Sequence, residues 1–321
     1  AFKEKEEKGA VALAFLDEAE ELCVATFDLC RQKQGEEHIV LVGHIQVLAC
    51  LYRLQGRYKE ADDLYQRGLQ ISLREYGKHD YYTLAMKRDF GVLHQKLGRY
   101  REAEILMDEA LAGWQEAWGQ EHPETLWTMS YLAWLYHSQA RYDEAESLFV
   151  KALETGRRIV GEMHICSLWS MKGLGTLYVS QGLYDKAEIL LTDVLKIGRP
   201  VLGDDHPQTL ASVNDLASLR MKQGHFEDAN NLFHEALRGR QHKLGDDHPE
   251  TLETINDLGI LHRQQQHYEH AERLLTKALE GRKIKLGDDH PHTLASLHEL
   301  AVLYKEQGDY DKAEPLLLEA V

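Results

Sequence analysis

Apolar residues recur at helical spacing along the chain, in paired segments that short polar stretches separate. In residues 293–306, for example, Leu294, Leu297 and Leu300 fall on one face of a helix. A polar break follows, and a second helical face begins at Tyr310. We call the first helix of such a pair helix A and the second helix B.

The helix pair repeats with a period of 42 residues and without insertion or deletion. A glycine precedes each helix A, and an aromatic residue, an alanine and a leucine follow at steps of three in each helix B. The glycines are Gly35, Gly77, Gly119, Gly161, Gly203, Gly245 and Gly287. The aromatic residues are Tyr58, Tyr100, Tyr142, Tyr184, Phe226, Tyr268 and Tyr310. The alanines run from Ala61 to Ala313 and the leucines from Leu64 to Leu316.

A single pair of amphipathic helices cannot bury both of its apolar faces, whereas stacked pairs can. The period therefore predicts one continuous all-α solenoid of helix-turn-helix units without a separate globular domain. We expect a partial repeat over residues 1–34, where Leu16, Ala19 and Leu22 match helix B, and seven units over residues 35–321. Because the chain does not begin with Met and its last unit stops inside helix B, we expect a piece of a longer protein.

Helix A carries one small residue in every repeat. A larger side chain there would push helix B away, so we expect the two helices to approach closely at this position. The residues are Ala49, Gly91, Ala133, Gly175, Ala217, Gly259 and Ala301.

The repeated pattern LGDDHPxTL, NDLAxL and QGxYxxAExLxxxAL resembles tetratricopeptide repeats (TPR) of the kinesin-light-chain type, over about residues 15–321. Similar arrays form the C-terminal sensor regions of signalling ATPases of the NLR/STAND class and accompany bacterial serine/threonine kinases. The resemblance implies a right-handed superhelical α-solenoid whose A helices line a concave groove that binds a peptide or protein segment. Such a fold serves many functions, so the function has to be argued from its surface.

The composition limits the partners. A formal net charge of −16 argues against nucleic acid, because phosphate binding needs a basic surface. No run of 18 apolar residues occurs, so we predict no membrane span. Cys23, Cys30, Cys50 and Cys166 form no C-x-x-C pair and indicate reduced thiols in a cytoplasmic protein.

The stretch GDDHP occurs three times, and its two carboxylates beside a histidine raise the question of a metal site. Helices of neighbouring repeats lie roughly 8–10 Å apart, so the three copies cannot share one ion. A structural role explains more of the stretch. Its glycine can end helix B in a left-handed turn, Asp205 or His206 can cap the next helix A, and Pro207 suits the first turn. We therefore predict no metal site.

Catalytic motifs are missing as well. The chain lacks G-x-x-x-x-G-K-[ST], H-E-x-x-H and G-x-S-x-G. The GDDHP stretch changes to GKHDYYT at Gly77 and to GEMHICS at Gly161 while the surrounding repeat continues, which is not expected of a catalytic centre. We predict neither enzymatic activity nor a bound cofactor, and an enzyme stays a remote alternative.

The residues that vary between repeats are the candidate binding residues. Trp127, Tyr131 and Trp134 share one face of a helix A, and Trp169 takes the place of Trp127 in the next repeat. Aromatic residues and arginine dominate binding energies at interfaces. The basic residues around this group are Arg88 and Lys172, with His137 near its end. The tryptophans could instead fill the space between A helices, and the sequence leaves both possibilities open.

Asn214 and Asn256 hold the position of Arg88 and Lys172 in later repeats. The resemblance implies that such asparagines hydrogen-bond the backbone of an extended peptide. The alternative is that they are ordinary polar residues of a helix surface.

Three further residues lie near the tryptophans of this group in the sequence. Gly173 has no packing explanation in the repeat, and it could open room beside Trp169. Trp114 and Trp118, near the end of a helix B, are expected to serve packing alone.

These observations favour a protein-interaction scaffold that captures a segment with acidic and aromatic residues along the concave groove. The alternative is the ligand-sensing C-terminal region of a larger signalling ATPase or kinase. The sequence leaves the oligomeric state open.

Overall fold

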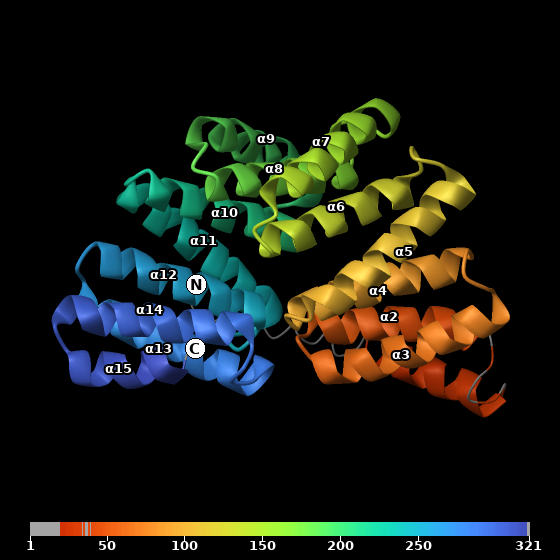
Figure 1. The fold of residues 1–321 in the computed structure, drawn as a ribbon, viewed down its shortest axis with the longest axis horizontal. Helices are drawn as coiled ribbons and strands as arrows, with labels where there is room; N and C mark the ends of the chain where they lie inside the picture. The colour runs from red at the N-terminus through yellow and green to blue at the C-terminus, as the bar shows by residue number, and fades with distance from the viewer. Residues whose placement is uncertain (1–19, 34, 36–37, 39, 320–321) are drawn as a thin grey trace. The chain divides into compact units, whose positions relative to one another are not determined.

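The described part of the chain consists of α-helices joined by short turns (Figure 1). A computed structural model describes residues 20–33, 35, 38 and 40–319, and no strand occurs among them. Residues 20–33 are helical. The helices that follow are α2 (Leu41–Leu54), α3 (Tyr58–Glu75), α4 (Tyr81–Lys96), α5 (Tyr100–Trp118), α6 (Pro123–Ser138), α7 (Tyr142–Ile159), α8 (Ile165–Ser180), α9 (Tyr184–Leu202), α10 (Pro207–Lys222), α11 (Phe226–Leu244), α12 (Pro249–Gln264), α13 (Tyr268–Leu286), α14 (Pro291–Gln307) and α15 (Tyr310–Glu319).

The helices alternate between helix A and helix B of the predicted repeat. Even-numbered helices are A and odd-numbered helices are B, so the all-α repeat fold predicted from the sequence is confirmed. Leu22 lies in the helix of residues 20–33, whereas Leu16 and Ala19 lie outside the described residues. The partial repeat over residues 1–34 and the single continuous array stay predictions.

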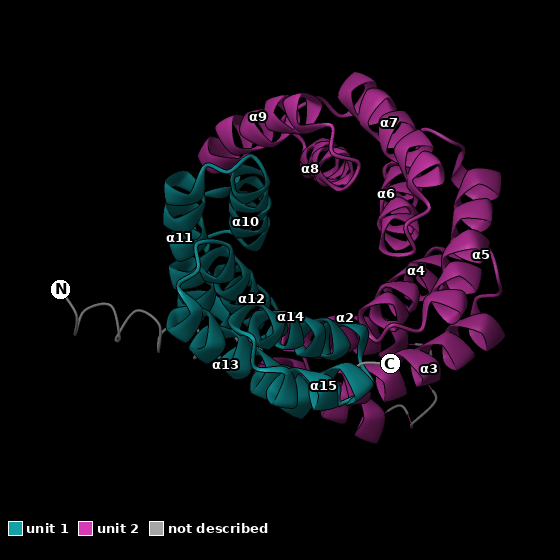
Figure 2. Ribbon diagram, turned by 60° about the vertical axis from the view of Figure 1, so that its left-hand side comes forward, with its two compact units in different colours: residues 1–13, 202–321 teal, residues 14–201 magenta. Residues whose placement is uncertain are grey.

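The structure divides into two compact units, which we describe separately (Figure 2). The N-terminal unit, residues 14–201, holds α2 to α9, and the C-terminal unit, residues 202–321, holds α10 to α15. In the N-terminal unit, α4 packs against α2 and α6, and α6 packs against α8. No such packing joins α3 to α5 or α5 to α7 within the residues described, so the even-numbered helices form the inner side of this unit. In the C-terminal unit, α12 likewise packs against α10 and α14.

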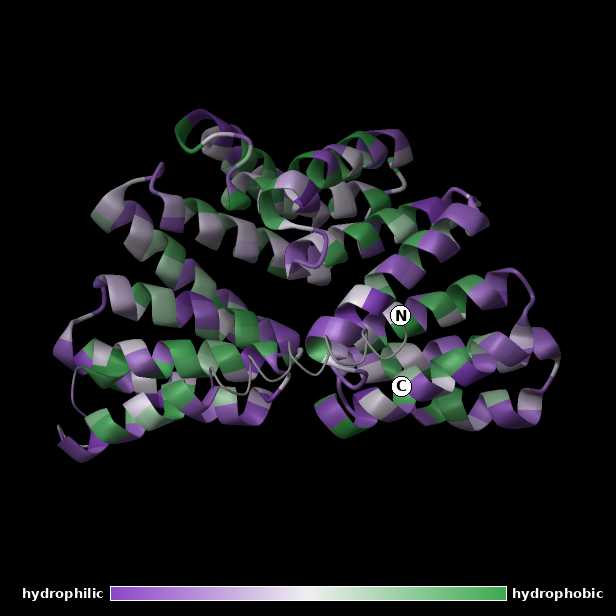
Figure 3. Ribbon diagram, turned by 180° about the vertical axis from the view of Figure 1, so that it is seen from behind, coloured by the Kyte–Doolittle hydropathy of each residue, from purple (hydrophilic) through white to green (hydrophobic). Residues whose placement is uncertain are grey.

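The small residue of helix A is where helix B comes closest. A Cβ atom added to Gly91 would lie 2.7 Å from Cγ of Met107 and 3.2 Å from the carbonyl oxygen of Ala103. Ala103 and Met107 are themselves fully buried. Hydrophobic and hydrophilic residues are interspersed along the helices (Figure 3). The predicted close approach is confirmed.

The glycine before each helix A has a backbone conformation that other residues rarely adopt. Gly119 has φ 87° and ψ 172°, and Gly245 has φ 89° and ψ 169°. The left-handed helical turn that we expected is wrong, because ψ near 170° belongs to a different region that is essentially restricted to glycine. The turn between helix A and helix B is less strict, since Ala140 and Gln266 hold the glycine position there with φ 58° and 61°.

The histidine and threonine of the repeated GDDHPxT stretch hold this turn together. Nδ1 of His206 accepts a hydrogen bond from the backbone N–H of Gln208 at 3.2 Å, so the histidine caps the helix rather than Asp205. In the equivalent stretch before α6, the Thr125 hydroxyl donates to the Gly119 carbonyl at 2.8 Å. Histidine caps also begin α6, α8, α12 and α14. The stretch therefore has a structural role.

Alanine in place of Gly119 is expected to lower the free energy of unfolding by about 2–3 kcal/mol, because its backbone region is essentially restricted to glycine. Gly98, with φ 72°, is the matched control, because alanine already occupies its repeat position at residue 140. Gly98→Ala should cost only about 1 kcal/mol. Urea unfolding followed by circular dichroism measures both losses, and equal losses would contradict the assignment.

Candidate functional site

Four aromatic side chains gather where the inner helices α6 and α8 meet. Trp127, Tyr131 and Trp134 share one face of α6, because residues three or four apart are neighbours on a helix. The ring centroid of Trp169, on α8, lies 6.5 Å from that of Trp127 and 5.9 Å from that of Trp134. It lies 6.0 Å from the ring of Tyr131. We call these four residues the aromatic cluster.

The ammonium group of Lys172 lies over this cluster. Nζ is 4.6 Å from the ring centroid of Trp134 and 5.3 Å from that of Trp169. A cation at this distance from an aromatic ring is attracted by the ring quadrupole. Because Lys172 is only 7% exposed, its charge lies where water screens it weakly.

The aromatic cluster is not sealed inside the core. All four side chains are half-buried, whereas Trp114 of α5 is fully buried. The indole N–H groups of Trp134 and Trp169 have no hydrogen-bond acceptor in the described part of the chain. The indole N–H of Trp114 is buried without an acceptor in the same way. A buried donor without an acceptor costs about 1–3 kcal/mol, so packing of the rings holds these tryptophans in place.

Gly173 has a packing role that the sequence did not reveal. A Cβ atom at this position would lie 2.2 Å from Cε1 of Phe149, a fully buried residue of α7. The Phe149 ring meets Trp134 edge-on, with centroids 5.5 Å apart. The idea that Gly173 has no packing explanation is therefore wrong. The glycine makes room for Phe149, and Phe149 supports the aromatic cluster.

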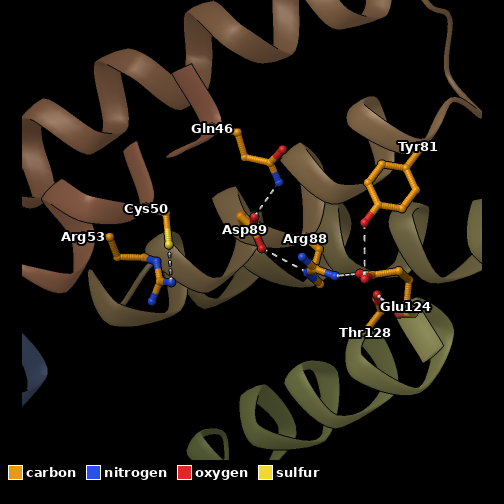
Figure 4. Close-up of polar contacts among 8 residues, drawn as sticks. All are labelled: Gln46, Cys50, Arg53, Tyr81, Arg88, Asp89, Glu124 and Thr128. Carbon is orange, nitrogen blue, oxygen red and sulfur yellow. Dashed lines mark hydrogen bonds and ion pairs between the residues drawn. The ribbon is translucent and has the colours of Figure 1, made fainter. Parts of the chain in front are cut away.

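Arg88 lies beside the cluster, but two carboxylates already hold it (Figure 4). Its Nε donates to Asp89 at 2.9 Å, and its Nη1 donates to Glu124. Burial alone would lower the pKa of the guanidinium, but Asp89 and Glu124 raise it above its ordinary value. Cζ lies 5.9 Å from the ring centroid of Tyr131. The positive charge that the sequence placed here is thus neutralised within the protein.

Arg53 of α2 is a basic residue that the sequence analysis missed. Its Nη2 donates to Sγ of Cys50 at 3.4 Å, and its buried Nε has no acceptor within the described residues (Figure 4). The nearby Asp89 is engaged with Arg88 and with Gln46, whose Nε2 donates to it at 2.9 Å. The guanidinium of Arg53 therefore forms no ion pair with a carboxylate in the described part of the chain, although the charge of Asp89 acts on it.

Arg263 of α12 holds the same position in its repeat as Arg53. Unlike Arg53, it is paired with carboxylates. Arg263 donates to Glu299 at 3.0 Å and to Glu306 at 2.5 Å. In the repeat of Arg53, the position of Glu306 is held by Lys96. That exchange of a carboxylate for a cation is the sequence signal that identifies Arg53.

His137 lies at the edge of the aromatic cluster, at the end of α6. Its ring meets Trp134 edge-on, with centroids 5.7 Å apart. Its Nε2 is 2.9 Å from the hydroxyl of Ser180, so this hydrogen bond joins the ends of α6 and α8.

Asn214 and Asn256 belong to the C-terminal unit and are bound within it. Asn214 donates to Asp257 at 2.9 Å and accepts from the hydroxyl of Thr254 at 3.0 Å. Asn256 accepts from the hydroxyl of Ser296 at 2.9 Å. Both side chains are buried, and their amides join successive A helices. A peptide-binding role for these two asparagines stays a prediction.

Trp114 and Trp118 differ in exposure. Trp114 is fully buried, and its ring centroid lies 4.9 Å from that of Trp118. Trp118 is 39% exposed and lies 6.1 Å from the ring of His122. Packing therefore accounts for Trp114, whereas Trp118 is partly exposed to solvent.

Three further properties of the described residues concern metal ligands, membrane-spanning helices and disulfides. Within the described ranges, no three His, Cys, Asp or Glu side chains are placed to hold a metal ion. None of the helices in the described part of the chain is both long enough and apolar enough to span a bilayer. The cysteines carry free thiols, and among them Cys166 is buried.

Family models of the tetratricopeptide repeat match most of the chain. One model matches residues 82–158, 136–199, 164–242 and 209–284. A second model matches residues 43–80 and 293–321. A comparison with curated proteins finds no match.

The chain is similar to several solved structures, and those of NprR, with TM-scores above 0.5, share its fold. Nearly identical TPR-like repeats designated kinesin light chain, from Podosopora anserina, are 28% identical and cover 62% of this chain and 95% of that chain, with a TM-score of 0.49. The quorum sensor NprR from B. thuringiensis is 13% identical, covers 98% of this chain and 86% of its own, and has a TM-score of 0.65. NprR in complex with its cognate peptide NprX is 14% identical, covers 99% and 89%, and has a TM-score of 0.67.

Replacing Gly173 by alanine is expected to lower the free energy of unfolding by about 1–3 kcal/mol, because the methyl group overlaps the Phe149 ring. Gly43 is the matched control, since it lies in α2 and a Cβ atom there meets nothing within 4 Å. Gly43→Ala should raise the free energy of unfolding by about 0.5–1 kcal/mol. Chemical unfolding measures both variants, and a neutral Gly173→Ala would contradict the packing role.

Asp257 is expected to limit stability at neutral pH. Burial, followed by the neighbouring Glu253 carboxylate, raises the pKa of Asp257 to about 6. A carboxyl group whose pKa is raised on folding contributes stability below about pH 4, and this is lost as the pH rises through about 6. Asp257→Asn should therefore raise the free energy of unfolding by about 1–2 kcal/mol near pH 7.5 and leave it unchanged near pH 3.5. Thermal unfolding at both pH values tests this, and destabilisation near neutral pH would contradict it.

Proposed function

Because the chain belongs to the tetratricopeptide-repeat family, we propose that it is an interaction scaffold that captures a peptide segment of a partner protein on its inner helices. The repeat fold itself is typical of protein–protein interaction. The observation that carries the proposal is the half-buried aromatic cluster beneath Lys172. Large rings beside a cation are the side chains that contribute most to binding energy at interfaces.

Packing between inner helices does not require tryptophan at these positions. Ala85, Ala211 and Ala295 hold the position of Trp127 and Trp169 in other repeats. The even-numbered helices of those repeats also pack against their neighbours. The rings are therefore additional to the repeat, which supports a binding role over a role as filler.

The chemistry of the inner face favours a segment with acidic and aromatic residues. A carboxylate of the segment can pair with the positive charge of Arg53, which forms no ion pair within the described residues. An aromatic side chain can pack on the half-buried rings of the aromatic cluster. The net charge of −16 disfavours a nucleic acid in the same place.

A role as the ligand-sensing region of a larger signalling ATPase or kinase would use the same surface. The likeness to NprR, whose solved complex holds the peptide NprX, is compatible with peptide capture by this fold. At 14% identity that likeness concerns the fold, so the argument for binding depends on the side chains of this chain.

A random peptide library displayed on phage tests the proposal, because it samples many segments without requiring that the partner be identified. The wild type should enrich peptides that combine aromatic and acidic residues. The double variant Trp169→Ala/Lys172→Glu should bind the enriched peptides at least about 100-fold more weakly, because each residue of such a centre contributes about 2 kcal/mol or more. Isothermal titration calorimetry measures the affinities.

Two single variants make this test specific. Trp118→Ala removes a tryptophan that is 39% exposed but lies outside the aromatic cluster, and it should leave the affinity unchanged. Arg53→Gln should weaken the peptides with an acidic residue and spare those without one. Unchanged affinity in a folded Trp169→Ala/Lys172→Glu variant would exclude the proposed surface.

A further inference from the structure

One position near the end of every helix A has a partner 32 residues earlier, in the preceding helix B. The helix A residues are Tyr52, His94, Tyr136, Tyr178, Arg220, His262 and Tyr304. The partners are Glu20, Asp62, Glu104, Glu146, Glu188, Asn230 and Glu272. The partner is thus a carboxylate in every repeat except that of His262, where Asn230 takes its place.

In two repeats the structure shows how the carboxylate contacts the residue of helix A. The Tyr304 hydroxyl donates to Glu272 at 2.8 Å. Nε2 of His94 lies 3.6 Å from Oδ1 of Asp62, and the charge of Asp62 offsets part of the effect of burial, which lowers the pKa of His94. Asn230 can supply no such charge to His262.

His262 is surrounded by other imidazoles instead. Its ring centroid lies 5.8 Å from that of His267 and 5.7 Å from that of His270, at the start of α13. Its Nδ1 is buried and has no hydrogen-bond partner among the residues described. Three imidazoles therefore meet where α12 and α13 join, and we call His262, His267 and His270 the imidazole group.

The charges around His262 come from α11 and α13. The groups that act on it electrostatically are His270, His267 and His234 of α11, and no carboxylate of the described part is among them. The adjacent Arg263 is directed to Glu299 and Glu306 of α14. Burial, followed by these three imidazoles, lowers the pKa of His262 below its ordinary value.

From this geometry we infer that the imidazole group makes the α12–α13 pair a proton-sensitive joint, which loosens at mildly acidic pH and releases helices α13 to α15. Protonated imidazoles about 6 Å apart repel one another, and no carboxylate at position 230 offsets the repulsion. In a repeat protein each pair is stabilised by its neighbours alone, so the loss of one interface acts locally.

The direction of the pH effect follows from linkage. A histidine whose pKa is lowered on folding binds its proton more readily in the unfolded chain. The stability that it contributes is complete above about pH 6.5 and is lost as the pH falls below that value. Loosening is therefore expected on acidification.

Hydrogen exchange of α12 and α13, corrected for the intrinsic pH dependence of exchange, tests the inference. Between about pH 7.5 and 5.5, protection in the wild type should fall about three- to tenfold, since tenfold is the limit for one imidazole whose pKa in the unfolded chain is near 6.5. Asn230→Glu restores the carboxylate and should reduce the fall to less than about threefold. Peptides from α6 and α7 are the internal reference, because Tyr136 holds the position there.

Two further variants guard against a misfolded Asn230→Glu protein. His267→Gln/His270→Gln removes two exposed imidazoles and should also flatten the pH dependence. His94→Tyr changes the equivalent histidine of the N-terminal unit and should leave α12 and α13 as in the wild type. Protection that does not change with pH in the wild type would overturn the inference. An undiminished fall in the His267→Gln/His270→Gln variant would overturn it too.

Discussion

The close approach of helix A and helix B within each repeat is the contact on which the rest of the structure depends. A glycine or alanine of helix A lies against helix B, as Gly91 lies against Met107 and Ala103 and Gly259 against Leu275. A larger side chain at either position would separate the helices, and a repeat packed only on its neighbours has no other core to absorb the shift. The constraint occupies few positions per repeat and leaves the others free to vary. Side chains on the inner face can therefore change, and with them the partner that is bound, without a change of the fold.

The sequence was sufficient to predict the fold and to predict that the residues of the aromatic cluster lie close together. An unbroken period assigns every residue a position in a helix pair, so Trp127, Trp134 and Trp169 could be placed on adjoining helix faces. It was not sufficient for Gly173, because the space beside a glycine depends on which side chain of another helix fills it. Phe149 comes from α7, and its ring orientation is set by packing rather than by the period.

The sequence alone also did not show which charged side chains of the inner face are already paired. Many polar side chains of the inner helices bind the residue 43 positions later, which belongs to the next repeat. Gln46 binds Asp89 and Asn214 binds Asp257 in this way. Arg263 binds Glu306 at the same separation. Arg263, with a carboxylate at this separation, is neutralised, whereas the residue 43 positions after Arg53 is Lys96. The same comparison between repeats singles out Asn230, where a carboxylate is missing beside His262.

The central claim is that a partner segment binds the aromatic cluster of the inner helices. Nuclear magnetic resonance of the five tryptophan indole N–H groups tests this directly, since each gives its own signal. On addition of a library-selected peptide, the signals of Trp134 and Trp169 should move furthest, because the ring currents of aromatic side chains that pack on the cluster act on them. The signals of Trp114 and Trp118 should stay in place. Movement confined to Trp114 and Trp118, or no movement at saturating peptide, would contradict the account.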